Sequence, residues 1–472
     1  MDNLLAHMRR SLVWTAAQQW GVQAIRLAVL MVLARMVSSA AFGVFAFAST
    51  AVGVVHLICN QGMTAAIVQR LELEDRHTGA ALASTLAGGL LMTAVLIAAS
   101  PWFGHLLANA AVVPLLRVLA WCLPLYALSN IAVALWRRSL AFKRIAVIVT
   151  ASQMLASIAA IALAVKGFGI WSLAARMLGE AVLMVVFTGW AIPWRLLFRA
   201  SYRGYGSGYR DMSRIAYPSA AVNLMALGRS RLDELLIGAA LGAEALGYYA
   251  LARRQIDGIY SLVPAVIANA LAPVISRIQS DAVRVKAVML RGIGLLGALT
   301  LPAFVGMGAS ASTWVPLLLG ARWLASVPVI QGMAVMAATR AIVGFSLASL
   351  FAIGHSGKRF LIELAGTAVC LLITIAALPF GIQTIAYACA IGMVLLTPFE
   401  LIWLSRWLGV SLREQMRALG GPILGAVLLL LIIAGVQNGP WRPISPILRL
   451  SLTAISAAII LLVGYRRIDP VR

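Results

Sequence analysis

The chain has 472 residues, of which 62% are hydrophobic and only 11% are charged, and its net charge is +23 at pH 7. Soluble globular domains are roughly 45–50% apolar and about 25% charged, so this composition excludes an ordinary soluble domain and indicates an integral membrane protein. We expect no nucleic-acid partner, because the Lys and Arg residues flank apolar spans, where they report topology and attract anionic membrane lipids.

Taken in chain order, the sequence is a series of apolar runs long enough to cross a bilayer as helices. The runs are too long and too continuous for the strands of a membrane barrel. The sequence therefore predicts an all-α integral membrane protein with about 14 transmembrane helices. The predicted spans are roughly 13–34, 42–62, 79–100, 112–135, 145–165, 169–191, 214–240, 246–270, 288–309, 327–352, 360–379, 382–404, 419–436 and 446–464.

Basic residues alternate strongly between the two sides of these spans. If the N-terminus is cytoplasmic, the segments on that side include Arg70, Arg76, Arg137 and Arg138, whereas the opposite loops and span ends are poor in Lys and Arg. No A-x-A-like cleavage site precedes the first span. We therefore expect a multi-pass protein with both termini in the cytoplasm and no cleaved leader.

An internal repeat divides the chain. The segment "LARMVSSAAFGVFAFA" (33–48) resembles "IGAALGAEALGYYALA" (237–252), so that Gly43 aligns with Gly247. The domains predicted from this repeat are an N-terminal six-helix lobe (1–191), a basic cytoplasmic linker (192–213), a C-terminal six-helix lobe (214–405) and two additional transmembrane helices (406–472). Parallel repeats of this kind predict two bundles that face each other across a central cavity.

Some charges lie inside the predicted spans, most visibly in "GRSRLDELLIG" (228–238). A charge that faces lipid costs at least about 2.5–3.5 kcal/mol, so such side chains should pair with acids or face water. The basic residues concerned are Arg26, Arg176, Arg229, Arg231, Arg253, Arg254 and Arg340.

Helical spacing offers acidic partners to four of these arginines. The predicted pairs are Arg229 with Asp233, Arg231 with Glu234, Arg253 with Asp257, and Arg176 with Glu180. Such pairs either lock helices together or line a polar path. Spacing offers no acid to Arg26, Arg254 and Arg340, and unpaired guanidinium groups suit an anionic substrate, best of all a phosphate.

Cofactor and metal motifs are not recognised. The "GHSGK" segment (354–358) lacks the spacing of a phosphate-binding loop, and the four cysteines lie inside apolar runs without a CxxC pair. We expect no cofactor and no metal. His56 is a candidate for proton coupling, with a hydrogen-bonded buried histidine as the alternative.

Several segments, taken together, carry a family resemblance. They are "LARMVSSAAFG" (33–43), "GMTAAIVQR" (62–70), "GFGIWSL" (167–173), "LLIGAALGAEALGYYALARR" (235–254), "LLLGARW" (317–323) and "AIGHSGKR" (352–359). In their order and spacing the chain resembles the bacterial polysaccharide flippases (Wzx-type, colanic-acid-exporter-like branch) of the multidrug/oligosaccharidyl-lipid/polysaccharide (MOP) exporter superfamily, from the first span to about residue 405.

The resemblance implies a two-lobed fold of fourteen helices in the bacterial inner membrane. It also implies alternating access that flips a lipid-linked (polyprenyl-pyrophosphate) oligosaccharide for lipopolysaccharide or exopolysaccharide biosynthesis, alongside a polymerase and other polysaccharide assembly proteins. A cationic cavity in related flippases takes the headgroup, which matches Arg26, Arg253 and Arg254 here. Arg229, Arg231, Asp233 and Asp257 would lie beside it, with Arg176, Glu180 and Arg340 as further candidates.

Two other functions stay open at this stage. A drug exporter of the same superfamily, driven by Na⁺ or H⁺, would favour acids in the N-terminal lobe, where only Glu180 lies within a span. A membrane glycosyltransferase or polymerase of the same pathway would need a sizeable extracytoplasmic loop with catalytic groups, and the predicted outer loops are short. We therefore expect a transporter rather than an enzyme.

Overall fold

The computed structural model describes residues 2–60, 62–70, 72–189, 205–262, 264, 271, 275–279, 281–438 and 445–468. Within these ranges, the side chains of residues 2–18, 60, 205, 215, 218–230, 282, 356, 438 and 461–468 lie outside the description. All regular structure in the described ranges is helical, as the sequence predicts. The chain forms two compact units, Met1–Gly247 and Tyr248–Arg472.

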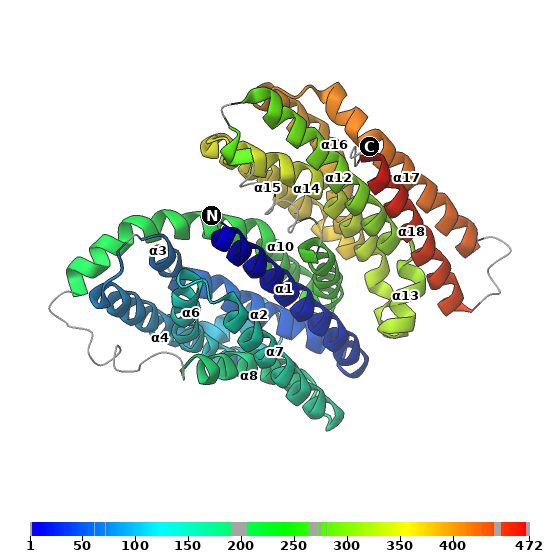
Figure 1. The fold of residues 1–472 in the computed structure, drawn as a ribbon. Helices are drawn as coiled ribbons and strands as arrows, with labels where there is room; N and C mark the ends of the chain where they lie inside the picture. Colours follow the sequence, from blue (N-terminus) through cyan, green and yellow to red (C-terminus); the bar gives the residue numbers. More distant parts are fainter. Residues whose placement is uncertain are drawn as a thin grey trace. The chain divides into compact units, whose positions relative to one another are not determined.

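The first unit is a bundle in which each long helix packs on a neighbour (Figure 1). Its helices are α1 (Asp2–Met36), α2 (Ser39–Asn60), α3 (Met63–Gln69), α4 (Asp75–Leu106), α5 (Val112–Ala120), α6 (Cys122–Arg138), α7 (Phe142–Val165), α8 (Ile170–Gly189) and the first part of α10 (Tyr205–Leu262). The helix α7 packs between α1 and α8, and α8 also contacts α6. These contacts bring the middle parts of α1, α7 and α8 together.

The second unit has α12 and α14 at its centre. It consists of the end of α10 followed by α12 (Ala282–Ala309), α13 (Ala311–Leu318), η2 (Ala321–Ser326), α14 (Val327–Ala352), α15 (Ser356–Ala377), η3 (Leu378–Phe380), α16 (Gly381–Leu408), α17 (Leu412–Asn438) and α18 (Pro446–Ile468). The helix α12 packs against α14, α17 and α18, and α16 packs against α14 and α15. Ile293, Leu296 and Phe345 are among the side chains of the apolar core that these helices share.

In the described ranges, ten helices are long and apolar enough to cross a membrane. One of these stretches, Gly357–Leu408, has 52 residues and holds α15 and α16, which pack against each other. It therefore covers both predicted spans 360–379 and 382–404. The finding confirms a helical multi-pass membrane protein, while the count of about 14 spans stays a prediction.

A single glycine divides the long α10. Gly242 has φ 83° and ψ −178°, a conformation that interrupts the helix and that side chains with a Cβ rarely adopt. The break lies between the predicted spans 214–240 and 246–270, so a short connection was expected there. Along the chain, the first compact unit ends a few residues later, at Gly247. The domain boundaries predicted from the repeat stay a prediction.

Two glycines of the predicted repeat meet each other within the first unit. A Cβ on Gly43 would lie 1.6 Å from the carbonyl oxygen of Ala243, and a Cβ on Gly247 would lie 2.0 Å from the carbonyl oxygen of Ser39. Only glycine allows α2 and the segment 243–247 to approach so closely, in the manner of small-residue contacts between membrane helices. In the aligned repeat, Ser39 corresponds to Ala243, and Gly43 to Gly247.

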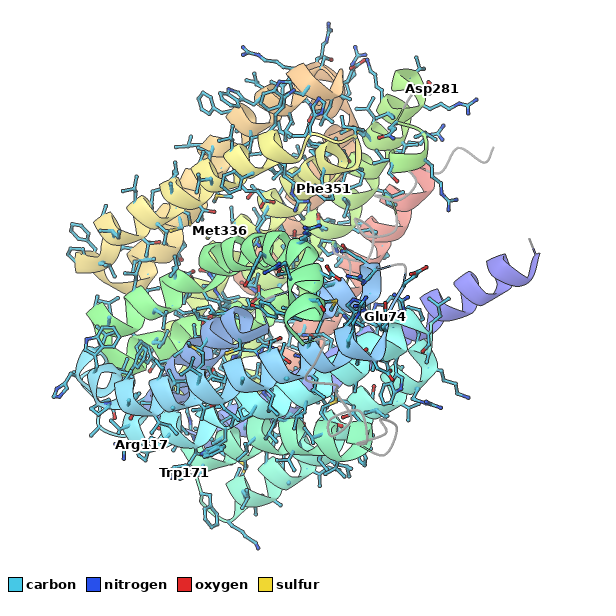
Figure 2. The ribbon with its side chains drawn as sticks, turned by 90° about the vertical axis from the view of Figure 1, so that its left-hand side faces the viewer. Glu74, Arg117, Trp171, Asp281, Met336 and Phe351 are labelled. Atoms are coloured by element: carbon cyan, nitrogen blue, oxygen red, sulfur yellow. The ribbon has the colours of Figure 1, made fainter. Side chains whose placement is uncertain are left out.

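The first unit has two chemically different ends. Figure 2 shows Glu74 at one end of its helices, and Arg117 with Trp171 at the other. The Glu74 end also carries Arg70, Arg76 and Arg138, in keeping with the predicted basic side of the membrane. Of the candidate site residues, Arg26, Arg176 and Glu180 lie on long helices of this unit.

Candidate functional site

A group of polar side chains lies among the apolar helices of the first unit. We define it as the Arg26 cluster, and its members are Arg26 on α1, His56 on α2, Tyr126 and Asn130 on α6, Gln153 on α7, and Arg176 and Glu180 on α8. Five helices thus contribute to it. An assembly of ionisable and amide side chains inside membrane helices marks a functional site by default.

Local sequence patterns place the members of the Arg26 cluster. Arg26 continues the spacing of Val22, Val29 and Leu33, which are buried on α1. Gln153 likewise belongs to the buried stripe of α7 that includes Ala156 and Ala160, and it is 3% exposed. These helix faces meet because α1 packs on α7.

The α8 side is brought close by a glycine. A Cβ on Gly179 would lie 3.6 Å from the Cβ of Ala156, so small residues face each other where α7 and α8 cross. The residue that follows this glycine is Glu180, and its carboxylate reaches Gln153 across the crossing.

A chain of hydrogen bonds joins three helices. The Nε–H of Arg26 donates to Oε1 of Gln153 at 3.3 Å. The amide Nε2 of Gln153 donates to Oε1 of Glu180 at 2.8 Å. Gln153 therefore lies between the guanidinium group and the carboxylate, and the two charges do not bond to each other directly.

Most of the Arg26 guanidinium is left available. Its side chain is exposed on the unit, and among the described residues no hydrogen bond or ion pair engages either of its Nη atoms. A guanidinium group has five N–H donors, four of which are on Nη1 and Nη2. Sequence spacing offers Arg26 no acid, and among the described residues its hydrogen-bond partner is the amide of Gln153.

The charges of the Arg26 cluster do not cancel. Arg176 interacts electrostatically with both Glu180 and Arg26. The predicted salt bridge between Arg176 and Glu180 is not among the ion pairs within 4 Å in the described part of the chain. Two guanidinium groups thus share one carboxylate, which leaves the cluster with an excess of positive charge.

The other side of the Arg26 cluster is aromatic. The rings of His56 and Tyr126 pack edge to face with centroids 5.0 Å apart, and the amide of Asn130 lies 3.3 Å from Nε2 of His56. This arrangement supports the alternative of a hydrogen-bonded histidine, while proton coupling through His56 stays a hypothesis.

The charged residues that are most prominent in the sequence lie on α10. Two of them, Arg231 and Glu234, bond to each other and to Thr50 of α2, and we call these three residues the closed group on α10. The carboxylate of Glu234 is 2% exposed and accepts from Arg231 Nη1 at 2.9 Å and from Thr50 Oγ1 at 2.5 Å. The backbone N–H of Glu234 donates to Asp233. The pairing of Arg231 with Glu234 is confirmed, whereas the side chain of Arg229, and hence its predicted pair with Asp233, lies outside the described residues.

The remaining candidates lie in the second unit. Arg253 is half-buried, and its guanidinium carbon lies 5.6 Å from the centroid of the Tyr249 ring, with Nη2 3.4 Å from the hydroxyl. Asp257 is exposed, and its predicted pair with Arg253 is not found in the described ranges. Arg254 is half-buried as well.

Arg340 has an aromatic neighbour instead of an acid. Its guanidinium carbon lies 5.5 Å from the centroid of the Tyr260 ring, which joins α14 to α10 within the second unit. A cation–π contact of this type stabilises a buried cation without neutralising it. The role of all these residues as a headgroup site stays a prediction.

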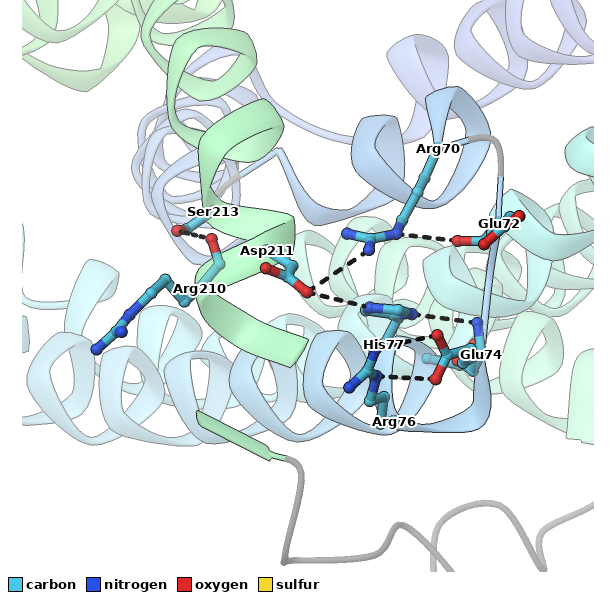
Figure 3. A network of polar contacts seen from close by, with 9 residues as sticks. Arg70, Glu72, Glu74, Arg76, His77, Arg210, Asp211 and Ser213 are labelled. Carbon is cyan, nitrogen blue, oxygen red and sulfur yellow. Dashed lines mark hydrogen bonds and ion pairs between the residues drawn. The ribbon is translucent and has the colours of Figure 1, made fainter. Parts of the chain in front are cut away.

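A second polar group closes the basic end of the first unit (Figure 3). We define it as the basic-end network, formed by Arg70, Glu72, Glu74, Arg76, His77, Arg138 and Asp211. Asp211, at the start of α10, lies 3.5 Å from Arg70 Nη2 and 3.6 Å from Nε2 of the fully buried His77. The network thus ties the start of α10 to α3 and α4.

Sequence reasoning missed Gln153, Thr50 and Asp211. Gln153 could have been found, because it is an amide inside the otherwise apolar span 145–165. Its partners lie 127 and 27 positions away along the chain, so no local spacing rule could name them. Within the described residues, no group of three or more His, Cys, Asp or Glu side chains could hold a metal ion.

Known proteins resemble this chain in sequence. The succinoglycan biosynthesis transport protein ExoT of Rhizobium meliloti (strain 1021) is 26% identical over 326 residues, which cover 68% of this chain and 64% of that protein. The lipopolysaccharide biosynthesis protein WzxC of Escherichia coli (strain K12) is 22% identical over 334 residues, which cover 70% of this chain and 66% of that protein. The matches span just under two thirds of the length of these relatives.

The fold also has a counterpart of known structure. The lipid II flippase MurJ, in an inward closed conformation, superposes with a TM-score of 0.74 at 12% identity and covers 98% of both chains. At that identity the likeness shows a shared fold.

The family assignment rests on a longer match. The family described as "Polysaccharide biosynthesis protein" matches residues 32–328, which is more than half of the chain. This region includes Gln153 and Glu180 of the Arg26 cluster and the whole of α10, while Arg26 itself lies just before it. The protein therefore belongs to the polysaccharide biosynthesis protein family.

Proposed function

We propose that this protein flips a lipid-linked oligosaccharide, carried on a polyprenyl pyrophosphate, from the inner to the outer leaflet of the cytoplasmic membrane. The observation that carries the proposal is the Arg26 guanidinium, held by one hydrogen bond among apolar helices with its Nη donors available. A guanidinium fork binds phosphate oxygens in pairs, and Arg26 is exposed on the first unit, where a headgroup can reach it. The relatives named above are a transport protein and a lipopolysaccharide biosynthesis protein, which supports this substrate class.

The architecture belongs to the same proposal. About 14 helices would form two six-helix lobes (1–191 and 214–405), joined by the linker 192–213 and followed by two helices (406–472). Both termini would be cytoplasmic. Alternating access would expose the headgroup to one side of the membrane at a time, and the product would pass to a polymerase and other assembly proteins for surface polysaccharide or exopolysaccharide.

The remaining candidates would extend the headgroup site. Arg253 and Arg254 would contribute further cations, with Arg340 beside them, whereas Arg229, Arg231, Asp233 and Asp257 would order the path around them. Arg231 is the weakest of these candidates, because Glu234 already neutralises it. Arg176 and Glu180 would set the charge around Arg26.

Deletion of the protein in its native host tests the function. We expect an undecaprenyl-pyrophosphate oligosaccharide to accumulate, as detected by mass spectrometry of extracted lipids, while surface polysaccharide falls. If no such lipid accumulates and sensitivity to cationic drugs rises instead, the protein is a drug exporter and this proposal is wrong.

Complementation of the deletion strain tests the site. Arg26→Ala should lower export at least about tenfold at unchanged protein level, because the group that binds phosphate is gone. The matched control is Arg117→Ala, which removes an exposed arginine that bonds Ser100 outside the Arg26 cluster. Equal export by both variants would refute the role of Arg26.

A further inference from the structure

The position of Gln153 between Arg26 and Glu180 has a consequence for substrate binding. We propose that Gln153 is a positioning residue that fixes the Arg26 guanidinium through Nε and keeps it apart from the Glu180 carboxylate, so that the Nη fork stays available for a phosphate. This inference rests on the proposed function of Arg26, and it assigns a role that spacing rules and charge patterns do not reveal.

The geometry allows only one orientation of the Gln153 amide. The guanidinium can only donate, so it must meet the amide oxygen, and the carboxylate accepts, so it must meet the amide nitrogen. Both bonds are present, at 3.3 Å and 2.8 Å. Because Gln153 is 3% exposed, water does not replace either partner readily.

A carboxylate at the same place would have the opposite effect on anion binding. A direct carboxylate–guanidinium pair is commonly bidentate and would occupy the donors that a phosphate needs. An amide occupies only the Nε–H and adds no charge. The amide therefore orders the arginine without neutralising it, while Glu180 holds the far side of the amide.

The closed group on α10 provides the internal contrast. There Glu234 bonds Arg231 directly at 2.9 Å, and the carboxylate is buried. The first unit thus contains one arginine that is neutralised by an adjacent carboxylate and one that is separated from its carboxylate by an amide. The difference lies in a single intervening side chain.

The test exchanges the amide and the carboxylate. The double variant Gln153→Glu with Glu180→Gln has the same composition and formal charge as the wild type, but its carboxylate bonds Arg26 directly. Inorganic pyrophosphate is the probe, and its binding to the full-length protein in lipid nanodiscs is measured by calorimetry. We expect the exchange to weaken pyrophosphate binding about tenfold at pH 7.5.

A double-mutant cycle shows whether the effect passes through Arg26. Arg26→Ala should weaken pyrophosphate binding strongly in the wild type and only slightly in the exchanged protein, because the arginine is already neutralised there. A purely structural role of Gln153 would change the melting temperature and leave this coupling at zero. The inference would be overturned if the coupling were zero, or if the exchanged protein bound pyrophosphate as tightly as the wild type.

Two further variants keep the test decisive if the exchanged protein does not fold. Glu180→Gln alone leaves Arg26 held by the amide and should not weaken pyrophosphate binding, whereas Gln153→Met should weaken it about threefold because the arginine is no longer fixed. If Glu180→Gln weakened pyrophosphate binding more than Gln153→Met did, the inference would be overturned. If Arg26→Ala binds pyrophosphate as well as the wild type, the proposed headgroup site itself fails; if only the Gln153 variants match the wild type, that site stands and the role of Gln153 does not.

Discussion

The basic-end network and the Arg26 cluster use the same residue types in the same unit, yet they differ in how far their donors are satisfied. In the basic-end network, Arg76 bonds Glu74 through both Nε and Nη2, and the carboxylate of Asp211 lies within 4 Å of Arg70 and His77. In the Arg26 cluster, the guanidinium makes one hydrogen bond, to an amide. The first group joins chain segments, whereas in the second the Nη atoms of Arg26 make no hydrogen bond or ion pair with any residue that the structure describes.

Position along the helices explains this difference. Loops and helix ends offer carbonyl oxygens, and Arg138 and Arg70 bond such oxygens at the basic end. In the middle of a helix the backbone carbonyls are already bonded, so an arginine there depends on side chains of its own helix or of other helices. Where the sequence provides Glu234, as on α10, the arginine is neutralised; where it provides Gln153, the arginine stays cationic and available.

The largest effect on stability should come from breaking the closed group on α10. Glu234→Ala leaves the Arg231 guanidinium without its carboxylate and Thr50 without its acceptor. Because Arg231 is 37% exposed and water can solvate it, the loss should be about 2–3 kcal/mol of unfolding free energy. Thermal unfolding of the purified protein measures this loss. The control is Asp75→Ala, which removes an exposed carboxylate in the first turn of α4 and should change the unfolding free energy by less than about 1 kcal/mol. Equal losses from both variants would contradict the burial of Glu234.

A smaller effect is expected at the start of α10. Asp211 is 39% exposed, and Asp211→Ala removes its contacts with Arg70 and the buried His77, which should cost about 2 kcal/mol. Asp211→Asn should cost less, because its amide oxygen can keep the 3.6 Å contact with Nε2 of His77. That contact is too long for a hydrogen bond, but Nε2 carries the proton, since Nδ1 accepts from the backbone N–H of Glu74. Melting curves of the two variants should differ in this order; the opposite order would mean that the charge alone stabilises the contact.

A still smaller stability effect is expected at the Arg26 cluster. Arg26→Ala removes one hydrogen bond at 3.3 Å from an exposed side chain and leaves Gln153 bonded to Glu180, so we expect a loss of about 1 kcal/mol. Unfolding of the purified variant should therefore resemble that of the wild type even where export stops. A loss as large as that of Glu234→Ala would show that Arg26 is mainly structural, and the contrast between the two groups would disappear.

Composition and periodicity were sufficient to predict the helical membrane fold and the connection at Gly242, because these depend on local physics. The charged residues inside spans could also be recognised, and the bond between Arg231 and Glu234 follows from their spacing. Spacing was misleading for Arg253 and Asp257. Asp257 is exposed, so water screens its attraction for a cation, and the Arg253 guanidinium lies against the ring of Tyr249, one turn earlier.

The partners of Arg26 could not be predicted in the same way. Gln153 carries no charge. Glu180 is nearer in sequence to Arg176 than to Gln153, the residue to which it is hydrogen-bonded. Their meeting depends on how α7 packs between α1 and α8, which is a tertiary property. Similarly, Thr50 meets Glu234 only because α2 and α10 belong to the same unit.

The smallest effect should come from the ion pair with the best geometry. Arg76 meets Glu74 at 2.8 Å and 3.0 Å, but the two side chains are 41% and 54% exposed, so water screens their attraction. Arg76→Ala should cost less than about 0.5 kcal/mol, and the similarly exposed pair of Arg284 and Asp281 in the second unit provides a matched variant, Arg284→Ala. Both should melt within the error of the wild type, in low salt and in high salt. A loss above about 1.5 kcal/mol for Arg76→Ala alone would show that the basic-end network stabilises the unit as a whole. Bond geometry, rather than exposure, would then determine how much an ion pair contributes to the free energy of unfolding of this protein.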